Sequence, residues 1–423
     1  MKVLIKKVTI HSPSSPLHGT VKDIFIENGL IATIGNDLNV QVDQVVEYPD
    51  LHASIGWMDC FANFCDPGEE YKETLESGAN AAAAGGFTEV MLIPNTQPFV
   101  SNKSQVEYLI QKGKSLPVTI RPIGAITKKT EGKELCEMYD MYNTGAIAFS
   151  DGLNPIQSSG ILQKALEYLL TIDVPAIQLP DDQSIGTHGL MNEGVISTRA
   201  GLPGKPALSE ELMVARDIEL ARYTGSKIHF TGVSTKKSLE LIAAAKAENL
   251  NITCSVTPYH LYFSDEDLAE YDTNLKVNPP LRTIKDRDAL RKGVIDGLVD
   301  FIASHHQPQD YDHKVCEFEY AKYGMEGLES VFGALGACGI STESFIKMQT
   351  ENVRNIFKLP VPEIKEGAKA SLTFYIPDLE YSFSEKDIFS KCRNNAFVGK
   401  TLKGKPIGIF NADQLFLSKN QPK

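Results

Sequence analysis

The chain has 423 residues, 42% of them hydrophobic and 23% charged, a composition typical of a packed globular protein long enough for one barrel-sized domain and a smaller unit. Its 54 acidic and 42 basic side chains leave a formal net charge of −12, which argues against nucleic-acid binding, and no apolar run approaches the roughly 20 residues that span a membrane. The seven cysteines lack paired zinc-type spacing, as expected of reduced thiols, so we expect a cytoplasmic protein.

The first part of the chain predicts antiparallel β structure. Apolar residues alternate in the stretches 3–10 and 22–35, and Glu27-Asn28-Gly29 supplies a hairpin turn within the second stretch. This segment has too little apolar surface to stand alone. We therefore expect it to pair with another part of the chain.

Eight short apolar runs follow, and helical patterns separate them. Helical periodicity is clear in the stretches 71–86, 209–225 and 235–249. The pattern is therefore βα repeated, and eight such units close a (β/α)8 barrel. The runs are GWMDCFAN (56–63), TEVMLIPN (88–95), TIRPIGAI (119–126), AIAFSDG (146–152), PAIQLPDD (175–182), KIHFTGVS (227–234), NITCSVTP (251–258) and DFIASHHQ (300–307).

Each apolar run ends in polar or unusual residues, and in a parallel barrel these ends share one mouth. One connection, residues 180–209, is long and rich in glycine, which is typical of a lid or of a partner-binding surface. The sequence therefore predicts a functional site at the mouth. The residues that end the runs are Asn63, Asn95, Asp151, Gln178, Gly232, Tyr259, His260, His305 and His306.

The C-terminal part returns to short strands, in the stretches 372–378 and 406–417. These strands also lack enough apolar surface to fold alone, so we expect them to pair with the N-terminal ones. The prediction is an α/β protein with a (β/α)8 TIM-like barrel from residues 56–364. A small β-sandwich domain built from residues 1–55 and 365–423 completes it.

Several stretches of the chain resemble the type I dihydroorotases of the amidohydrolase superfamily, which are cyclic amide hydrolases of pyrimidine biosynthesis. The most specific is DPGEEYKETLESGANAAAAGGFTEVMLIPNTQP (66–98), and residues 216–235, 255–261, 276–283 and 394–405 follow in the family's order. The resemblance covers essentially the whole chain. It implies a barrel enzyme in which a metal ion turns water into hydroxide and polarises the substrate carbonyl.

The metal ligands that this resemblance implies are almost all replaced. Phe61 and Asn63 stand at the family's His-x-His pair, where phenylalanine cannot ligate a metal and asparagine is a weak neutral donor. The ligating histidines of the fifth and sixth strands fall at Gln178 and Gly232. Only Asp151 matches an acidic ligand of the family, so we expect no bound metal.

The eighth-strand motif of the family, Asp-His-Ala-Pro-His, supplies a ligand that is also the general base. Here the matching run begins with His305 and His306, so an imidazole occupies the position of the general base. A general base alone contributes only about 10²–10⁴-fold, below the roughly 10⁶-fold or more of typical enzymes. We therefore assign no catalytic residue, and expect His305 to fill vacated space and His306 to keep a structural hydrogen bond.

The substrate contacts implied by the resemblance are replaced unevenly. Cys65 stands where the family has an arginine that grips the substrate carboxylate, and Gln309 replaces the last histidine of the eighth-strand motif. Asn95 and Asn278 remain as candidate substrate-binding residues. Both also lie in turn-forming stretches, PNTQP and NPPLR, so a structural role is equally consistent with them.

The prediction is a dihydroorotase-like protein linked to pyrimidine biosynthesis that is catalytically inactive. It would act as a scaffold or regulator, for example with aspartate carbamoyltransferase, and by resemblance as a homodimer. The alternative is an active dihydroorotase, or a hydrolase of another cyclic ureide such as hydantoin or allantoin, with zinc at an atypical site. A third hypothesis is a sensor whose pocket binds a small pyrimidine precursor.

Overall fold

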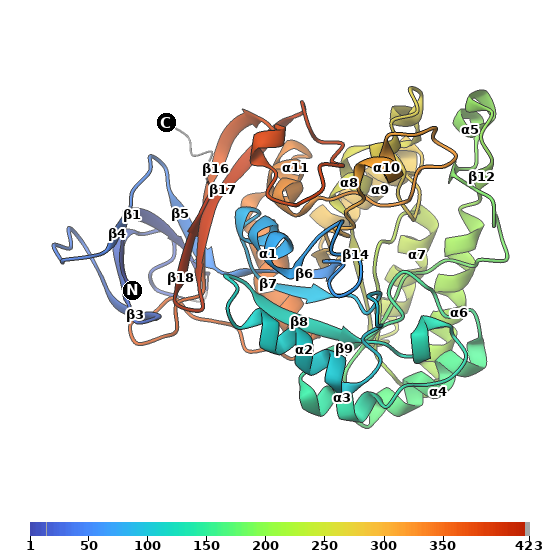
Figure 1. The fold of residues 1–423 in the computed structure, drawn as a ribbon, viewed down its shortest axis with the longest axis horizontal. Helices are drawn as coiled ribbons and strands as arrows, with labels where there is room; N and C mark the ends of the chain where they lie inside the picture. The colour runs from blue at the N-terminus through green and yellow to red at the C-terminus, as the bar shows by residue number, and fades with distance from the viewer. Residues whose placement is uncertain (14, 419–423) are drawn as a thin grey trace.

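Eight parallel strands form a barrel at the centre of the molecule (Figure 1). The computed structural model describes residues 1–13 and 15–418 of the chain. Every apolar run expected to form a barrel strand contains one, so the predicted (β/α)8 architecture is confirmed. In order around the barrel the strands are β6 (Trp57–Ala62), β7 (Phe87–Leu92), β8 (Thr119–Gly124), β9 (Ala148–Phe149), β10 (Ala176–Gln178), β13 (Ile228–Phe230), β14 (Ile252–Val256) and β15 (Phe301–Ile302).

Buried side chains bridge the seam between the first strand, β6, and the last, β15. The carboxylate of Asp59 accepts hydrogen bonds from the backbone N–H of Ser304 at 2.7 Å and from its hydroxyl at 2.8 Å. The amide of Gln349 donates to the carbonyl oxygens of Met58 at 3.2 Å and of Ile302 at 2.9 Å. These bonds satisfy backbone groups that are buried away from water, and so they complete the barrel wall.

Helices pack around the barrel. The helix predicted for residues 71–86 begins only at Leu75, because the hydroxyl of Thr74 accepts a hydrogen bond from the backbone N–H of Ser77 and caps it there. No helix in the described part of the chain is long and apolar enough to cross a membrane. The helices around the barrel are α1 (Leu75–Ala84), α2 (Lys103–Gly113), α3 (Met138–Thr144), α4 (Ser159–Leu170), α6 (Leu208–Thr224), α7 (Lys236–Ala247), α8 (Pro258–Tyr262), α9 (Ile284–Ile295), α10 (Tyr311–Lys314), α11 (Val331–Ala337), α12 (Thr342–Lys347) and α13 (Val353–Ile356).

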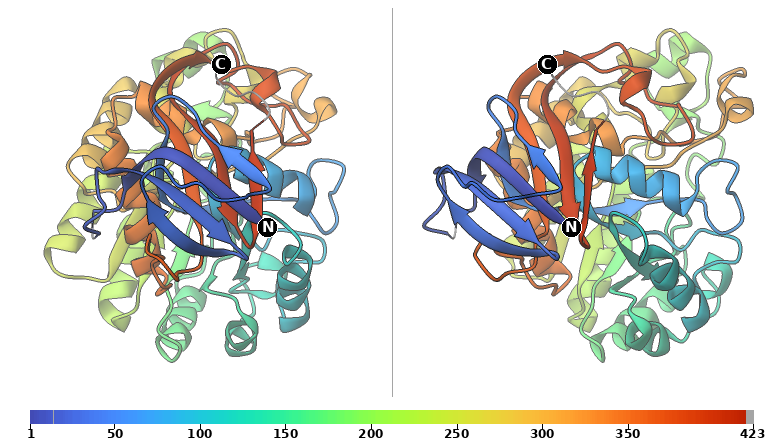
Figure 2. Two further views of the ribbon diagram at one scale, coloured as in Figure 1. Left: turned by 90° about the vertical axis from the view of Figure 1, so that its left-hand side faces the viewer. Right: turned by 60° about the vertical axis from the view of Figure 1, so that its left-hand side comes forward.

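Strands from the two ends of the chain form a second sheet beside the barrel, as expected. Figure 2 shows the N-terminal strands in blue next to the C-terminal strands in red, and β16 joins the two groups by pairing antiparallel with β5. Asn28 and Gly29 have φ values of 50° and 75°, as the tight turn predicted between β2 and β3 requires. The strands of this sheet are β1 (Lys2–His11), β2 (Val21–Glu27), β3 (Leu30–Gly35), β4 (Gln44–Val46), β5 (His52–Ile55), β16 (Leu372–Ser382), β17 (Thr401–Asn411) and β18 (Gln414–Leu417).

Trp57 connects the terminal sheet to the barrel. It is fully buried, and its indole N–H donates a 2.9 Å hydrogen bond to the hydroxyl of Ser54. Its ring packs against Phe345, Phe332 and Tyr375, with ring centroids 4.8, 4.9 and 5.4 Å apart. Tyr375 belongs to the terminal sheet and Trp57 to the barrel, so the sheet and the barrel share a continuous apolar contact.

The long glycine-rich connection after β10 is partly ordered. Within residues 180–209, β11 (Met191–Asn192) pairs in parallel with β12 (Gly204–Lys205), and the helix α5 (Val195–Ala200) lies between them. Figure 1 shows α5 and β12 at the edge of the molecule far from the terminal sheet. The connection therefore forms a small folded excursion beside the ends of the barrel strands.

Candidate functional site

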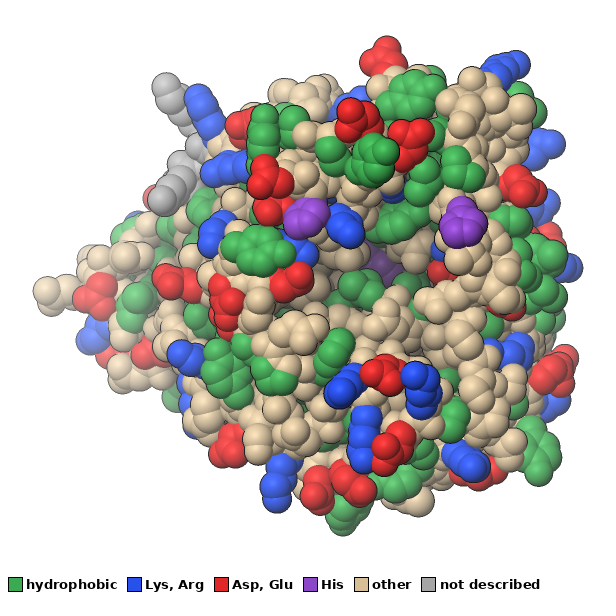
Figure 3. Space-filling model, turned by 45° about the vertical axis from the view of Figure 1, so that its right-hand side comes forward, with side chains coloured by type: hydrophobic (Ala, Val, Ile, Leu, Met, Phe, Trp, Pro, Cys, Tyr) green, Lys and Arg blue, Asp and Glu red, His purple; other side chains and the backbone are tan. Residues whose placement is uncertain are grey.

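The carboxyl ends of the barrel strands open on one face of the molecule. In Figure 1 the strands β6, β7 and β8 run toward this face and away from the terminal sheet. Figure 3, which views the molecule obliquely from this side, shows a hollow in which histidine and hydrophobic side chains are visible. Of the nine residues predicted to end the strands at the mouth, all except the half-buried Asn95 are buried, and Phe61 beside them is 2% exposed.

Three of the predicted positions pack against one another. The ring of Phe61 stacks on the imidazole of His305, with centroids 4.4 Å apart and 29° between the ring planes. Gly232 lies against the same imidazole, since a β-carbon added to it would be 2.6 Å from Cε1 of His305. A histidine at position 232 therefore has no room while His305 keeps this place. Three residues that stand where the family resemblance implies metal ligands are thus in van der Waals contact with one another.

The His305 imidazole is buried and engaged in a hydrogen bond. Its Nε2 lies 2.7 Å from the hydroxyl of Thr231. Burial, and to a smaller extent the positive charge that His260 would carry, lower the pKa of His305 to about 3. The ring is therefore neutral at physiological pH, and it is a weak base compared with a catalytic base whose pKa matches the working pH.

Asn63 and Gln178 are held by local contacts. The side-chain oxygen of Asn63 accepts a 2.8 Å hydrogen bond from the backbone N–H of Cys65, and the Asn63 N–H donates to the carbonyl oxygen of His306 at 2.8 Å. The backbone carbonyl oxygen of Gln178 accepts from the backbone N–H of Thr231 at 2.9 Å, which joins the ends of the paired strands β10 and β13. Burial raises the pKa of the Cys65 thiol, so it stays protonated where the family has an arginine.

Asp151 and Asn95 anchor the loops that follow β8 and β9. The Asp151 carboxylate accepts hydrogen bonds from the backbone N–H of Thr127 at 2.8 Å and from the Thr127 hydroxyl. Its pKa is raised to about 6, because burial outweighs these bonds. The Asn95 amide donates to the carbonyl oxygen of Asp151 at 3.1 Å and accepts from the Leu153 N–H at 3.0 Å. Both side chains thus have backbone partners that fix loop geometry.

Asn278 lies in different surroundings, in a pocket of about 320 Å³ under the connection that follows β10. The Lys205 ammonium group donates to Asp181 at 2.6 Å and to the Asn278 side-chain oxygen at 2.8 Å. The other oxygen of Asp181, Oδ1, is buried and has no hydrogen-bond partner among the described residues. The pocket therefore presents a cationic donor beside an unused acceptor. Its lining is Asp181, Gln183, Ile185, Gly186, Thr187, Gly189, Lys205, Asn278 and Tyr323.

Gln309, the other residue at a family substrate position, faces a second pocket of about 440 Å³ whose lining includes Lys391 and Asn394. Its side-chain amide donates to the carbonyl oxygen of Tyr323 at 2.8 Å. The residues at the family's substrate positions therefore have separate local roles. Sequence reasoning missed Lys205 and Asp181, because the path of the glycine-rich connection that brings Lys205 to the strand end is set by tertiary contacts.

The residues at the mouth do not fit the zinc that the family resemblance implies. Zinc takes imidazole, thiolate and carboxylate donors that converge on one point. Phe61 and Gly232 offer no donor atom, and the Asn63 oxygen already accepts from a backbone N–H. Both oxygens of Asp151 accept hydrogen bonds from Thr127, and Nε2 of His305 is bonded to Thr231. No metal-dependent step can be derived from these side chains.

Comparisons with known proteins agree with the architecture. A family model described as dihydro-orotase-like matches residues 55–238. A dihydroorotase from Carboxydothermus hydrogenoformans is 40% identical over 391 residues, 91% of each chain. A dihydroorotase from Pelotomaculum thermopropionicum is 39% identical over 414 residues, 96% of each chain. The likeness thus spans both the barrel and the terminal sheet.

Solved structures show the same fold at lower sequence identity. The L-hydantoinase (dihydropyrimidinase) from Arthrobacter aurescens superimposes with a TM-score of 0.85 at 20% identity, over 99% of this chain and 96% of that one. The dihydropyrimidinase from Brevibacillus agri gives a TM-score of 0.83 at 18% identity, over 100% of this chain and 96% of that one. At these identities the likeness concerns the fold, since one fold supports many activities.

Proposed function

The chain belongs to the dihydroorotase family of amidohydrolases, and from that premise we propose that it has no hydrolytic activity and serves pyrimidine biosynthesis as a scaffold or regulator. The observation that carries the proposal is the packing at the mouth. The ring of Phe61 stacks on His305, and Gly232 leaves no room for another side chain beside them. At three positions where the family resemblance implies metal ligands, this chain therefore has groups that pack against one another.

The chemistry of the remaining groups supports the proposal. Amide hydrolysis needs an activated water and a group that stabilises the developing negative charge on the substrate oxygen. His305 is the one imidazole at the family's general-base position, but its pKa of about 3 and its bond to Thr231 make it a poor proton acceptor. Asp151, with a pKa of about 6, is engaged by the Thr127 loop.

A kinetic comparison tests the proposed loss of activity. The purified full-length protein is assayed for dihydroorotate hydrolysis and for the reverse cyclisation of carbamoyl aspartate, with and without added Zn²⁺. The Carboxydothermus hydrogenoformans dihydroorotase serves as the positive control under identical conditions, and hydantoin and allantoin are included as substrates. We expect rates more than about 100-fold below the control, because a general base alone supplies at most about 10⁴-fold of the roughly 10⁶-fold or more that typical enzymes reach. Turnover within about 100-fold of the control would overturn the proposal.

The proposed partner is aspartate carbamoyltransferase, and the chain itself is proposed to be a homodimer. The excursion around α5 offers a contact surface, because Val195 exposes 65% of its surface and Leu208, just after β12, exposes 49%. Size-exclusion chromatography with light scattering, on the protein alone and mixed with the transcarbamoylase of the same organism, measures both assemblies. A monomer that co-elutes with nothing would reject the scaffold role.

A second candidate function is the binding of a small pyrimidine precursor in the 320 Å³ pocket, and the Lys205–Asp181 arrangement favours it. A ureido carboxylate such as carbamoyl aspartate carries an acceptor for the Lys205 ammonium group and N–H donors for Oδ1 of Asp181. Isothermal titration calorimetry with carbamoyl aspartate and with dihydroorotate tests this directly. Absence of heat at millimolar ligand would reject a sensor role. Binding that persists in Lys205→Met would place the ligand elsewhere.

A further inference from the structure

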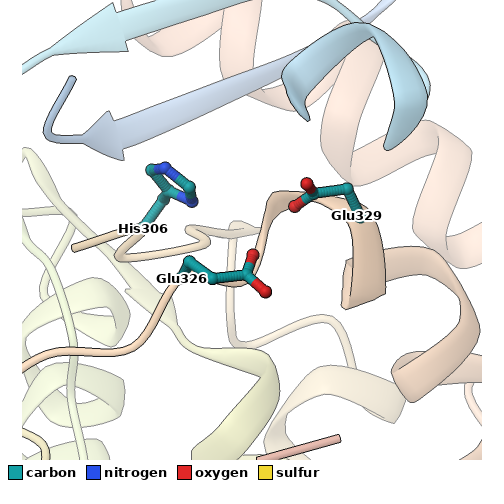
Figure 4. Close-up of side chains that lie close together, drawn as sticks. All are labelled: His306, Glu326 and Glu329. Atoms are coloured by element: carbon teal, nitrogen blue, oxygen red, sulfur yellow. The ribbon is translucent and has the colours of Figure 1, made fainter. Parts of the chain in front are cut away.

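Four ionisable side chains meet beside the carboxyl end of β15, where residues 389–391 of the C-terminal part of the chain contact the barrel. His306 follows His305, and its ring lies near the carboxylates of Glu73, Glu326 and Glu329. All four residues expose 4% of their surface or less. One donor atom each of His306, Glu326 and Glu329 lies within 4.8 Å of the other two. Figure 4 shows the His306 ring and the two carboxylates facing a common space.

The carboxylates in this group lack compensating partners. Both oxygens of Glu326, which is fully buried, have no hydrogen-bond partner among residues 1–13 and 15–418. Glu329 uses Oε1 to accept from the backbone N–H groups of Phe389 at 2.8 Å and Ser390 at 3.0 Å, but its Oε2 has no partner within the same ranges. Two buried carboxylates side by side cannot both stay ionised without compensation, so either a proton or a bound cation must balance them.

The His306 ring is oriented as a metal ligand would be. Its Nε2 lies 3.5 Å from Oε2 of Glu73, within ion-pair distance but without a hydrogen bond of ordinary geometry. Its Nδ1 faces the segment that carries Glu326 and Glu329, where its lone pair accepts a 3.2 Å hydrogen bond from the backbone N–H of Gly327 that a bound metal ion would have to replace. Metal-ligating histidines usually have a carboxylate beside their second ring nitrogen, and Glu73 lies on that side of this ring.

The Glu73 carboxylate beside the His306 ring is itself held in place by hydrogen bonds. It accepts hydrogen bonds from the hydroxyls of Ser77 and Ser390 and from the backbone N–H of Lys391 at 3.2 Å. The carboxylate therefore belongs to a fixed network that links the first helix, α1, to the C-terminal segment. Its position fixes the orientation of the His306 ring through Nε2.

We propose that Nδ1 of His306 and the carboxylates of Glu326 and Glu329 bind one divalent transition-metal ion, with Glu73 as the positioning residue. One imidazole with two carboxylates suits Zn²⁺ or Mn²⁺ better than Mg²⁺ or Ca²⁺, which prefer oxygen ligands only. Ligands of a tetrahedral zinc at about 2.1 Å lie about 3.4 Å apart. The present spread of 4.8 Å closes to that value with small rotations of the glutamate side chains.

A metal in this place would act structurally. Glu329 and Glu73 already bond to residues 389–391, which come from the C-terminal part of the chain. An ion between Glu329 and His306 would thus tie the end of β15 to the C-terminal segment that covers this side of the barrel. The site adjoins the mouth, because the carbonyl oxygen of His306 accepts a hydrogen bond from Asn63, but it uses none of the side chains of Phe61, Gly232 and His305.

Zinc binding by the intact chain tests the proposal. The full-length protein is stripped of metal with a chelator and titrated with ZnCl₂ by calorimetry, and its thermal midpoint is followed in parallel. We expect one Zn²⁺ per chain and a midpoint that rises with zinc concentration, because the ion binds the folded state. Glu326→Gln, which keeps the shape and removes the charge, should weaken binding at least about 100-fold. Glu73→Gln should weaken it by roughly 10–100-fold.

Two further variants separate this site from others on the chain. His305→Asn changes the neighbouring residue that faces the mouth, and it should leave the zinc affinity within about two-fold of wild type. Glu329→Gln should repeat the loss seen with Glu326→Gln. If the folded wild type binds no Zn²⁺ at millimolar concentration, a proton rather than a cation balances the carboxylates and the proposal fails. Equal affinity of wild type and Glu326→Gln would reveal adventitious binding and overturn it as well.

Discussion

Gly232 tests whether the former ligand positions at the mouth are held by mutual packing. Its φ of +68° lies in the left-handed region, and a β-carbon there would be 2.6 Å from Cε1 of His305. Gly232→Ala therefore carries two separate costs. The backbone cost is about 1–2 kcal/mol, and displacing a buried group in a packed core adds about 1–3 kcal/mol. We expect the free energy of unfolding to fall by about 2–5 kcal/mol.

Gly225 provides a matched control for the backbone cost. Its φ is +74°, and a β-carbon added there meets nothing within 4 Å. Gly225→Ala should therefore cost only the backbone part, about 1–2 kcal/mol. In a His305→Gly background the 2.6 Å contact disappears and only Cδ1 of Leu179, 3.3 Å away, stays close, so Gly232→Ala should cost little more there than Gly225→Ala does. The difference between the two backgrounds is the coupling energy, about 1–3 kcal/mol.

Urea unfolding at pH 7 measures these differences. Trp57 is the only tryptophan of the chain and is fully buried, so its fluorescence reports the transition. A change in midpoint at constant slope gives the change in stability. The packing argument would be refuted if Gly232→Ala cost no more than Gly225→Ala, or if its cost were the same with and without the His305 side chain.

Two buried groups should give pH dependences of opposite sign. Burial lowers the pKa of His229 to about 3, so the unfolded state binds a proton at a higher pH than the folded state does. The free energy of unfolding of wild type should therefore fall by about 2 kcal/mol relative to His229→Gln between pH 6.5 and pH 5. Burial raises the pKa of Asp217 to about 6, although the positive charge of Arg216 acts in the opposite direction, so the folded state binds a proton at a higher pH than the unfolded state does. The free energy of unfolding of wild type should therefore rise by about 2 kcal/mol relative to Asp217→Asn as the pH falls from 6 to 4. Urea titrations at several pH values check both, and a stability difference that stays constant with pH contradicts the corresponding pKa shift.

The fold was accessible from sequence because its signals are local and repeated. Each barrel strand lies within its apolar run or, for β7, begins one residue before it, and the helices α6 and α7 follow their periodic stretches to within two residues at each end. The hairpin at Asn28 and Gly29 has the positive φ values that this residue pair favours. Departures occur where distant residues intervene. Residues 71–74 stay outside α1, and Glu73 among them bonds to Ser390 and Lys391 from the far end of the chain.

The candidate sites depended on tertiary contacts to a greater degree. The identities of Phe61, Gly232 and His305 are visible in the sequence, but their mutual contact is not. The cluster of His306 with three glutamates gives no sequence signal, because its members come from segments before α1, after β15 and before α11. The Lys205–Asp181 pair is hidden for the same reason, since its lysine lies in a connection without a regular pattern.

The amino-acid sequence by itself determined the repeated strand–helix pattern, the pairing of the two chain ends and the residue types at the ends of the barrel strands. Those properties depend on residue types and on periodicities of a few residues. Only the tertiary structure decided that a phenyl ring stacks on an imidazole at the mouth, and that unpartnered carboxylates face His306 beside it. The physical reason is that side-chain partners are chosen by distance in space, and the barrel brings together residues that lie hundreds of positions apart.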